Sequence, residues 1–320
     1  MEHNFIADVG GTNIRLALVE SGDITSVKKY LCNDFSTIEE AINQFKQDVN
    51  VVKFSAGCIA IACPVNHDVV KMTNHSWVFS KTTLQASLGL SEMYVINDFT
   101  AVAFSLPWLK DDQVIQVGQG TAIDKGNIAV FGPGTGLGVE HLTYTSTGWQ
   151  TLDGEGGHVD FSPNDENDII IWHYLKSLHG RASAEEVMSG RGIVNIYNAF
   201  CGHKGIKPVF TDPADITTAA LNNADETAYQ TLQQFCRIMG AFAGNLALNL
   251  CTTGGVFVGG GIIGKLGKFF LNSEFRAYFE NKGMFNHYVK DIPTFIIDEP
   301  DHGLLGALAY LTQQQSQSTK

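Results

Sequence analysis

The sequence has no CxxC pair among its six cysteines, no surplus of basic residues, and no apolar run long enough to span a membrane. We expect the cysteines to be reduced and mostly buried. The N-terminal residues pass directly into a strand pattern, without the charged and apolar segments of a signal peptide. These absences predict a cytoplasmic protein that does not bind a membrane.

The charge balance excludes another class of partner. With 33 acidic against 21 basic residues the formal net charge is −12, and the basic residues form no stripe, so we expect no nucleic-acid binding. The length of 320 residues suits two domains of ordinary size. The 33 glycines exceed the roughly 22 that average usage of about 7% would give, and they are clustered, which indicates binding turns rather than flexibility.

The stretch Tyr94–Asp98 has the pattern of a buried strand that ends abruptly in an amide and a carboxylate. Parallel sheets place their chemistry at the carboxyl ends of strands. Asp98 is therefore our candidate general base. A helical pattern begins at Phe99, however, so Asn97 or Asp98 could equally serve as its N-cap.

The first glycine cluster, Gly10–Asn13, lies between two strand patterns, Phe5–Val9 and Ile14–Val19, and so predicts a hairpin. Freed backbone N–H groups in such a turn can form an anion nest, and the carboxylate of Asp8 beside it can hold the waters of Mg²⁺. A simple glycine turn would also explain the pattern. It is not a dinucleotide fingerprint, because a strand rather than a helix follows.

The same form recurs later in the chain. A strand pattern at Ile128–Phe131 is followed by the turn Gly132–Gly138 and a second strand at Val139–Leu142. Thr12 and Thr135 occupy equivalent places in the two units. This weak internal repeat predicts two related halves that face one cleft, each offering a backbone nest to part of a polyphosphate.

Three carboxylates and a histidine lie in the following segments. Glu155 and His158 are separated by two glycines, which makes a loop more plausible than a helix, and both could reach one small ligand there. A solvated turn is the alternative. Ser183 can cap a helix whose first turn contains Glu185 and Glu186, and that role would by itself explain both carboxylates.

Two further segments are ambiguous. The stretch Met72–Trp77 is polar with one large aromatic, as in a sugar site or in a loop anchored by a tryptophan. The run Gly259–Lys265 nearly matches a Walker A loop, but Leu266 replaces the required hydroxyl, so we retain only a glycine surface suited to adenosine.

The C-terminal half also contains long helical patterns. We expect a helix from Asp225 to about Asn249 with one small-residue face, and a helix at Gly303–Tyr310 followed by a frayed polar tail from Gln313 to Lys320.

Together these segments closely resemble the bacterial glucokinases of the hexokinase, Hsp70 and actin superfamily. The resemblance covers nearly the whole chain and rests on segments in the right order: Asp8–Asn13, Ile96–Phe99, Gly132–Gly138, Gly154–His158, Ser183–Glu185 and Gly255–Gly261. Related repressor-type sugar kinases have a cysteine-rich zinc motif after the Gly-Gly-His segment. This chain has no cysteine between Cys63 and Cys201, which places it with the zinc-free group.

The resemblance implies an α/β fold of two domains, the actin-like ATPase (ribonuclease H-like) fold, with a cleft between them. We expect a small domain of residues 1–108 plus 300–320, a large domain of residues 109–299, and a homodimer. It also implies ATP-dependent phosphorylation of D-glucose to D-glucose 6-phosphate, the first step of glycolysis, with MgATP as co-substrate.

The resemblance assigns roles to matching residues. Asp98 matches the catalytic base, which also contacts the sugar, and Asp8 would act on Mg²⁺ through water. The other sugar ligands would be Asn97, Glu155, His158 and Glu185. The ATP contacts would be Ala7, Asp8, Val9, Gly10, Gly11, Thr12, Asn13, Gly134, Thr135, Gly136, Gly259, Gly260 and Gly261.

Three other functions remain open at this level. The substrate could be a neighbouring hexose. An actin- or Hsp70-like ATP switch would need the nests but no polar sugar pocket, so Glu155 and His158 argue against it. A sugar sensor without chemistry is disfavoured by the intact Asp98.

Overall fold

The computed structural model describes residues 3–318, which form two compact units. The first unit contains the chain up to Lys110, the segment Thr145–Thr151 and the chain from Glu299 onward. The second unit contains Asp111–Tyr144 and Leu152–Asp298. The sequence analysis expected the C-terminal segment to join the first domain, but it did not anticipate that Thr145–Thr151 would do so.

The first unit is built on a five-stranded sheet with the order β3-β2-β1-β4-β7. Its strands are β1 (His3–Val9), β2 (Asn13–Glu20), β3 (Asp23–Leu31), β4 (Phe54–Ile61) and β7 (Glu92–Asn97). The predicted hairpin is confirmed, because β1 and β2 pair antiparallel, while β4 pairs parallel with both β1 and β7. The carboxyl ends of β1, β4 and β7 therefore meet at one edge, with Val9 opposite Ile61 and Ile61 opposite Asn97.

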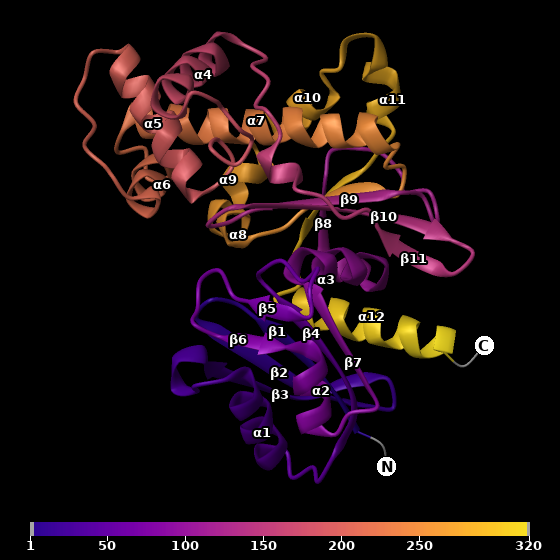
Figure 1. The fold of residues 1–320 in the computed structure, drawn as a ribbon. Coiled ribbons are helices and arrows are strands. Elements are labelled where there is room, and N and C mark those ends of the chain that lie inside the picture. The colour runs from indigo at the N-terminus through magenta and orange to yellow at the C-terminus, as the bar shows by residue number, and fades with distance from the viewer. Residues whose placement is uncertain (1–2, 319–320) are drawn as a thin grey trace. The chain divides into compact units, whose positions relative to one another are not determined.

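Helices cover this sheet, and two of them, α3 and α12, pack against each other, as Figure 1 shows. The C-terminal helix α12, drawn in yellow, packs against α3, with Gly306 in close contact with the backbone of Ala101. The remaining elements of the unit are α1 (Ile38–Asp48), α2 (Lys81–Leu88), α3 (Asp98–Ser105), α12 (His302–Ser318), the hairpin β5 (Val69–Lys71) and β6 (Val78–Ser80), and the 3-10 helices η1 (Cys32–Asp34) and η2 (Leu106–Trp108).

The second sheet has the order β11-β10-β9-β12-β13-β8. Its strands are β8 (Val114–Val117), β9 (Ile128–Pro133), β10 (Leu137–Thr145), β11 (Gly148–Thr151), β12 (Gly255–Val258) and β13 (Thr294–Ile297). Strand β9 pairs antiparallel with β10 and parallel with β12, which in turn pairs parallel with β13. This repeats the arrangement of the first sheet and bears out the internal repeat that the two glycine turns indicated.

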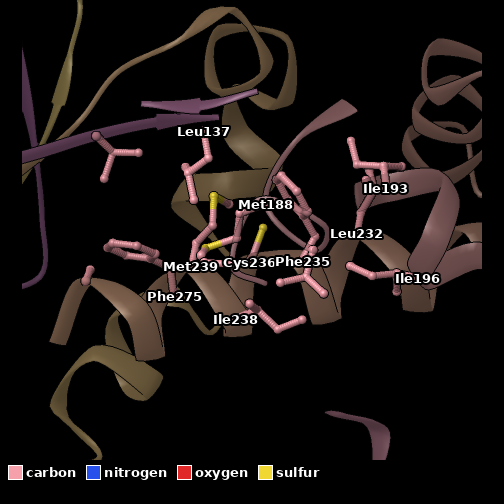
Figure 2. Packing of buried hydrophobic residues seen from close by; sticks show 14 of the residues in the cluster. Leu137, Met188, Ile193, Ile196, Leu232, Phe235, Cys236, Ile238, Met239 and Phe275 are labelled. Carbon is pink, nitrogen blue, oxygen red and sulfur yellow. The ribbon is translucent and has the colours of Figure 1, made fainter. Parts of the chain in front are cut away.

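The second unit also contains most of the helices. They are α4 (Glu166–His179), α5 (Gly190–His203), α6 (Pro213–Leu221), α7 (Glu226–Leu250), α8 (Gly261–Leu266), α9 (Lys268–Leu271), α10 (Phe275–Glu280), α11 (Asn286–Lys290) and the 3-10 helices η3 (Asp111–Gln113), η4 (Gly156–His158) and η5 (Gly283–Phe285). The predicted small face of α7 is confirmed, since a side chain on Gly240 would collide with the backbone of Phe275 in α10. Figure 2 shows the core around α7, where Leu137 and Met188 lie near Met239.

The structure corrects two local predictions. No helix begins at Ser183, whose backbone bridges Asp160 instead, and the cap of α5 is Ser189, which accepts a hydrogen bond from Gly192 N–H. The expected frayed tail is also wrong for Gln313–Ser318, which is helical; Thr319 and Lys320 lie outside the described residues. Gln313 is held at this end because it both donates to and accepts from the backbone of Trp149.

Two open points are also resolved. Trp77 is buried, and its indole N–H donates to the Phe35 carbonyl at 3.1 Å, so it is an anchor of the loop and not the wall of a sugar site. The cysteines are free thiols, and five of the six are buried, with Cys251 exposed.

Candidate active site

Asn97 and Asp98 lie at the junction of β7 and α3, and the structure separates their roles. The side-chain oxygen of Asn97 accepts a hydrogen bond from Phe99 N–H at 2.9 Å, so Asn97 is the N-cap of α3. Its amide nitrogen also donates to the Cys63 carbonyl at 3.4 Å. Because Asn97 caps the helix, Asp98 is not needed for that task.

The carboxylate of Asp98 is in an unfavourable environment for a charge. Burial, with a smaller contribution from the neighbouring charge of Asp8, raises the pKa of Asp98 to about 6 against the hydrogen bonds that lower it. A carboxyl group with a pKa near 6 is charged at neutral pH and is a stronger base than an ordinary aspartate. The side chain is only partly exposed, at the carboxyl edge of the sheet.

Asp8 lies at the same edge, on β1. Its carboxylate is 3.4 Å from the guanidinium of Arg15, which faces it across the hairpin, and it contacts Gly303 at the start of α12. Burial raises the pKa of Asp8, although the charges of Arg15 and His302 oppose this shift.

A metal ion at Asp8 would find few protein ligands. Within residues 3–318, no group of three or more His, Cys, Asp or Glu side chains is arranged to hold a metal. A single carboxylate fits Mg²⁺ that takes its remaining ligands from phosphate oxygens and water.

The turn Gly10–Asn13 follows β1 at this edge. Gly10 N–H donates to the Asn13 carbonyl at 2.9 Å, and Gly11 packs against Asn74 from the β5–β6 loop. The side chains of Ala7 and Val9 are fully buried in the sheet. The structure of the first unit thus brings Asp8, Asp98 and this turn together at one edge.

In the second unit, Glu185 joins two of the predicted segments. One of its carboxylate oxygens, Oε2, accepts a hydrogen bond from Leu137 N–H at 3.0 Å, just after the glycine turn at Gly134–Gly136. Its backbone N–H donates to the Gly157 carbonyl at 2.8 Å. Glu185 is therefore fixed to both the hairpin and the Glu155–His158 segment.

The Glu155–His158 segment forms a single 3-10 turn, η4, where a loop was expected. His158 N–H donates to the Glu155 carbonyl at 2.9 Å, and both side chains are exposed. Gly157 between them is buried against Leu137, and a Cβ there would collide with the Leu137 carbonyl oxygen. The structure therefore brings Glu155, His158 and Glu185 together beside the second glycine turn.

The third cluster, Gly259–Gly261, follows β12. Gly259 N–H donates to the Phe131 carbonyl at 2.9 Å, so this turn lies next to the end of β9. The two glycine turns of the second unit are therefore neighbours at the carboxyl edge of its sheet.

Comparison with known proteins identifies the family. The sequence profile described as Glucokinase matches residues 5–314. The glucokinase of Shigella boydii serotype 18 is 46% identical over 315 residues, which is 98% of each chain. The chain belongs to the glucokinase family.

Solved structures agree with this assignment. The crystal structure of glucokinase from an Antarctic psychrotroph superposes with a TM-score of 0.92 at 33% identity, covering 98% of this chain and 99% of that one. A ROK hexokinase from Thermus thermophilus shares the fold at a TM-score of 0.68 and 16% identity, covering 98% and 99%. Members of the glucokinase family phosphorylate D-glucose with ATP to give D-glucose 6-phosphate, and the chain is accordingly a kinase.

Two features of this glucokinase-family chain were missed by the sequence analysis. Arg15 lies directly opposite Asp8 in the β1–β2 register, which the hairpin itself could have indicated. Arg191 binds Glu185, but no local pattern signals that contact because the predicted helix start was wrong.

Within residues 3–318 no helix is long and apolar enough to cross a membrane.

Proposed function

We propose that the chain transfers the γ-phosphoryl group of ATP to the 6-hydroxyl of D-glucose, with Asp98 as the general base. The observation on which this proposal depends is the environment of Asp98. The pKa of Asp98 is raised, and its side chain is partly buried at a sheet edge beside a glycine turn. Helix capping would be the ordinary reason for a carboxylate at this position, but Asn97 caps the helix instead.

Phosphoryl transfer requires the reactants to be aligned and the developing charge to be stabilised, with little covalent work by the protein. Asp98 accepts the proton of the sugar hydroxyl as its oxygen attacks the γ-phosphorus. The backbone N–H groups of the turns at Gly10–Asn13 and Gly134–Gly136 stabilise the phosphate charge. Asp8 is the residue that would hold the waters of the Mg²⁺ that enters with ATP, and this ion supplies charge neutralisation when bound.

The sugar ligands in this proposal are Asn97, Glu155, His158 and Glu185. Asn97 uses its oxygen for the cap, so it serves the sugar through the second hydrogen of its amide nitrogen. Glu155 and His158 are exposed on a turn anchored by Glu185, which leaves their side chains available for sugar hydroxyls. The Gly259–Gly261 turn offers a surface to the adenosine.

In the same proposal the two units adopt the actin-like ATPase arrangement and close over a cleft that excludes water during transfer. The enzyme works in the cytoplasm as a homodimer. Sedimentation of the purified chain tests the dimer, and a single species at the mass of one chain would contradict it.

A coupled assay of ADP release across a panel of hexoses, with MgATP, tests the function. We expect D-glucose to give the highest kcat/KM, because a site that hydrogen-bonds each hydroxyl rejects analogues that lack one. ATP hydrolysis that needs no sugar would instead favour the ATP switch. A much higher kcat/KM with mannose or fructose would assign a different hexose.

The role of Asp98 is tested with Asp98→Asn and a matched control. The variant should lower kcat by about 10²–10⁴-fold, because the amide cannot accept the proton. Asp168 in α4 is a suitable control, since burial raises its pKa to about 6 as well, and it lies in a hydrogen-bonded network with Gln234 rather than in the proposed site. Asp168→Asn should leave kcat unchanged; near-normal turnover in Asp98→Asn would remove the base from the mechanism.

A further inference from the structure

Arg191 makes a set of contacts that the proposed mechanism does not yet use. Its guanidinium donates to Glu185 Oε1 at 3.1 Å and to Glu186 Oε1 at 2.7 Å through the same nitrogen, and its Nε donates to both oxygens of Glu186 at 3.0 and 3.1 Å. Asn195 Nδ2 also donates to Glu186 Oε2, at 3.0 Å. Glu186 thus fixes the guanidinium, and the guanidinium in turn reaches Glu185.

The two oxygens of Glu185 are therefore held by different parts of the unit. Oε2 accepts from Leu137 N–H in the hairpin, and Oε1 accepts from Arg191 in the first turn of α5. Each carboxylate oxygen retains a second lone pair that can accept a sugar hydroxyl. A carboxylate fixed at both oxygens has lost most of its rotational freedom before the sugar arrives, which lowers the entropic cost of binding.

The same segment is attached to the glycine turn at its other end. Gly190 N–H, adjacent to Arg191, donates to the Gly134 carbonyl at 2.9 Å. The side chain of Leu137 enters the hydrophobic core near Met188, as Figure 2 shows. Residues 185–191 therefore hold the turn from both sides, and Arg191 completes a rigid support for Glu185.

We propose that Arg191 is a positioning residue for glucose, which acts by orienting the carboxylate of Glu185 through the Arg191–Glu186 pair. This inference rests on the proposed function, because it takes Glu185 as a sugar ligand. Arg191 does not itself touch the sugar.

The exposure of the pair separates this role from a structural one. The Arg191 side chain is 52% exposed, against 19% for Glu185 and 17% for Glu186. An ion pair with so exposed a partner contributes little to folding stability. Removal of Arg191 should therefore change the KM for glucose and leave the Tm nearly unchanged.

A double-mutant cycle on Arg191→Gln and Glu185→Gln tests the proposal. Arg191→Gln should raise the KM for glucose by about threefold to tenfold and leave the KM for ATP and the Tm nearly unchanged. In the Glu185→Gln background the same substitution should change the glucose KM little, because the group that it positions is already altered. Arg191→Lys keeps the charge but not the forked geometry, and it should give an intermediate KM.

Arg237→Gln is the matched control. It removes another helix arginine that is paired with a glutamate, Glu274, outside the proposed site, and its glucose KM should equal that of the unmodified chain. An unchanged glucose KM in Arg191→Gln, or an equal rise in both backgrounds, would overturn the positioning role. If Glu185→Gln alone left glucose use intact, the sugar assignment of the proposed function would be wrong instead.

Discussion

Asp8 and Asp98 come from two strands of one sheet, and the charge of Asp8 contributes to the raised pKa of Asp98. Asp8 lies one residue before the end of β1, and Asp98 follows β7 two strands away at the same edge. The proposed metal-binding carboxylate and the proposed base are therefore electrostatically linked.

The first prediction concerns the pH dependence of catalysis. The base must be ionised to accept a proton, so kcat/KM for glucose should fall as the pH drops below about 6, the folded pKa of Asp98. Asp8→Asn removes a neighbouring negative charge and should move this acidic limb to lower pH, whatever it does to the maximum rate.

Asp68→Asn is the control for that shift. It makes the same change in net charge on an exposed carboxylate that hydrogen-bonds Thr82, and it should leave the limb in place. An acidic limb that Asp8→Asn does not move would show that Asp98 is not the group that titrates.

The second prediction concerns stability. A carboxyl group whose pKa is higher in the folded state destabilises the fold once the pH exceeds the unfolded value, and the cost is complete above the folded value. For Asp98 the window runs from the ordinary 3.8 to about 6. Asp98→Asn should therefore raise the free energy of unfolding at pH 7.5 by at most about 3 kcal/mol, seen as a higher Tm, and show no gain at pH 3. An equal or lower Tm at pH 7.5 would mean that the charge is well satisfied in the fold.

The third prediction separates the two roles of Asn97. Asp caps helices as well as Asn, so Asn97→Asp should keep the Tm close to its original value. A carboxylate cannot donate to a sugar hydroxyl, and it adds a charge beside Asp98, so kcat/KM for glucose should fall by about tenfold or more. Asn97→Ala should lower both the Tm and the activity. Unchanged glucose kinetics in Asn97→Asp would leave Asn97 as a cap alone.

The fourth prediction uses the close approach at Gly157. Gly157→Ala places a methyl group against the Leu137 carbonyl and should push the Glu155–His158 turn away from Glu185. We expect the free energy of unfolding to fall by about 1–3 kcal/mol and the KM for glucose to rise. Gly154→Ala is the matched control, because a Cβ at Gly154 has nothing within 4 Å. Similar kinetics in the two variants would show that the turn is not held by this contact.

The sequence predicts those parts of the fold that local pattern decides. Glycine turns between alternating apolar segments indicated both hairpins, and the short apolar run before Asp98 indicated β7. The helix predicted from Asp225 also occurs, and the Asp225 side chain caps it by accepting a hydrogen bond from Ala228 N–H.

The failures have a common physical cause, namely contacts between distant segments. Ser183 has good capping chemistry, but its backbone pairs with Asp160, and Glu185 is bound to Gly157 and Leu137. The polar residues Gln313 and Gln317 look like a tail until they bind the backbone of Trp149 and Thr147. Arg191 reaches Glu185 only in the folded chain, where the helix starts later than predicted. The pairing of Arg15 with Asp8, in contrast, follows from the hairpin register and could have been deduced.

The first unit is assembled from both ends of the chain, and this has a consequence for biosynthesis. Its sheet is covered by α12, whose Leu304, Ala307 and Leu308 pack in one cluster with residues of β1 and β4. A ribosome makes α12 after every strand of that sheet. The segment up to Lys110 therefore lacks its α12 cover while the second unit is translated, and at that stage the nascent chain would need protection from aggregation.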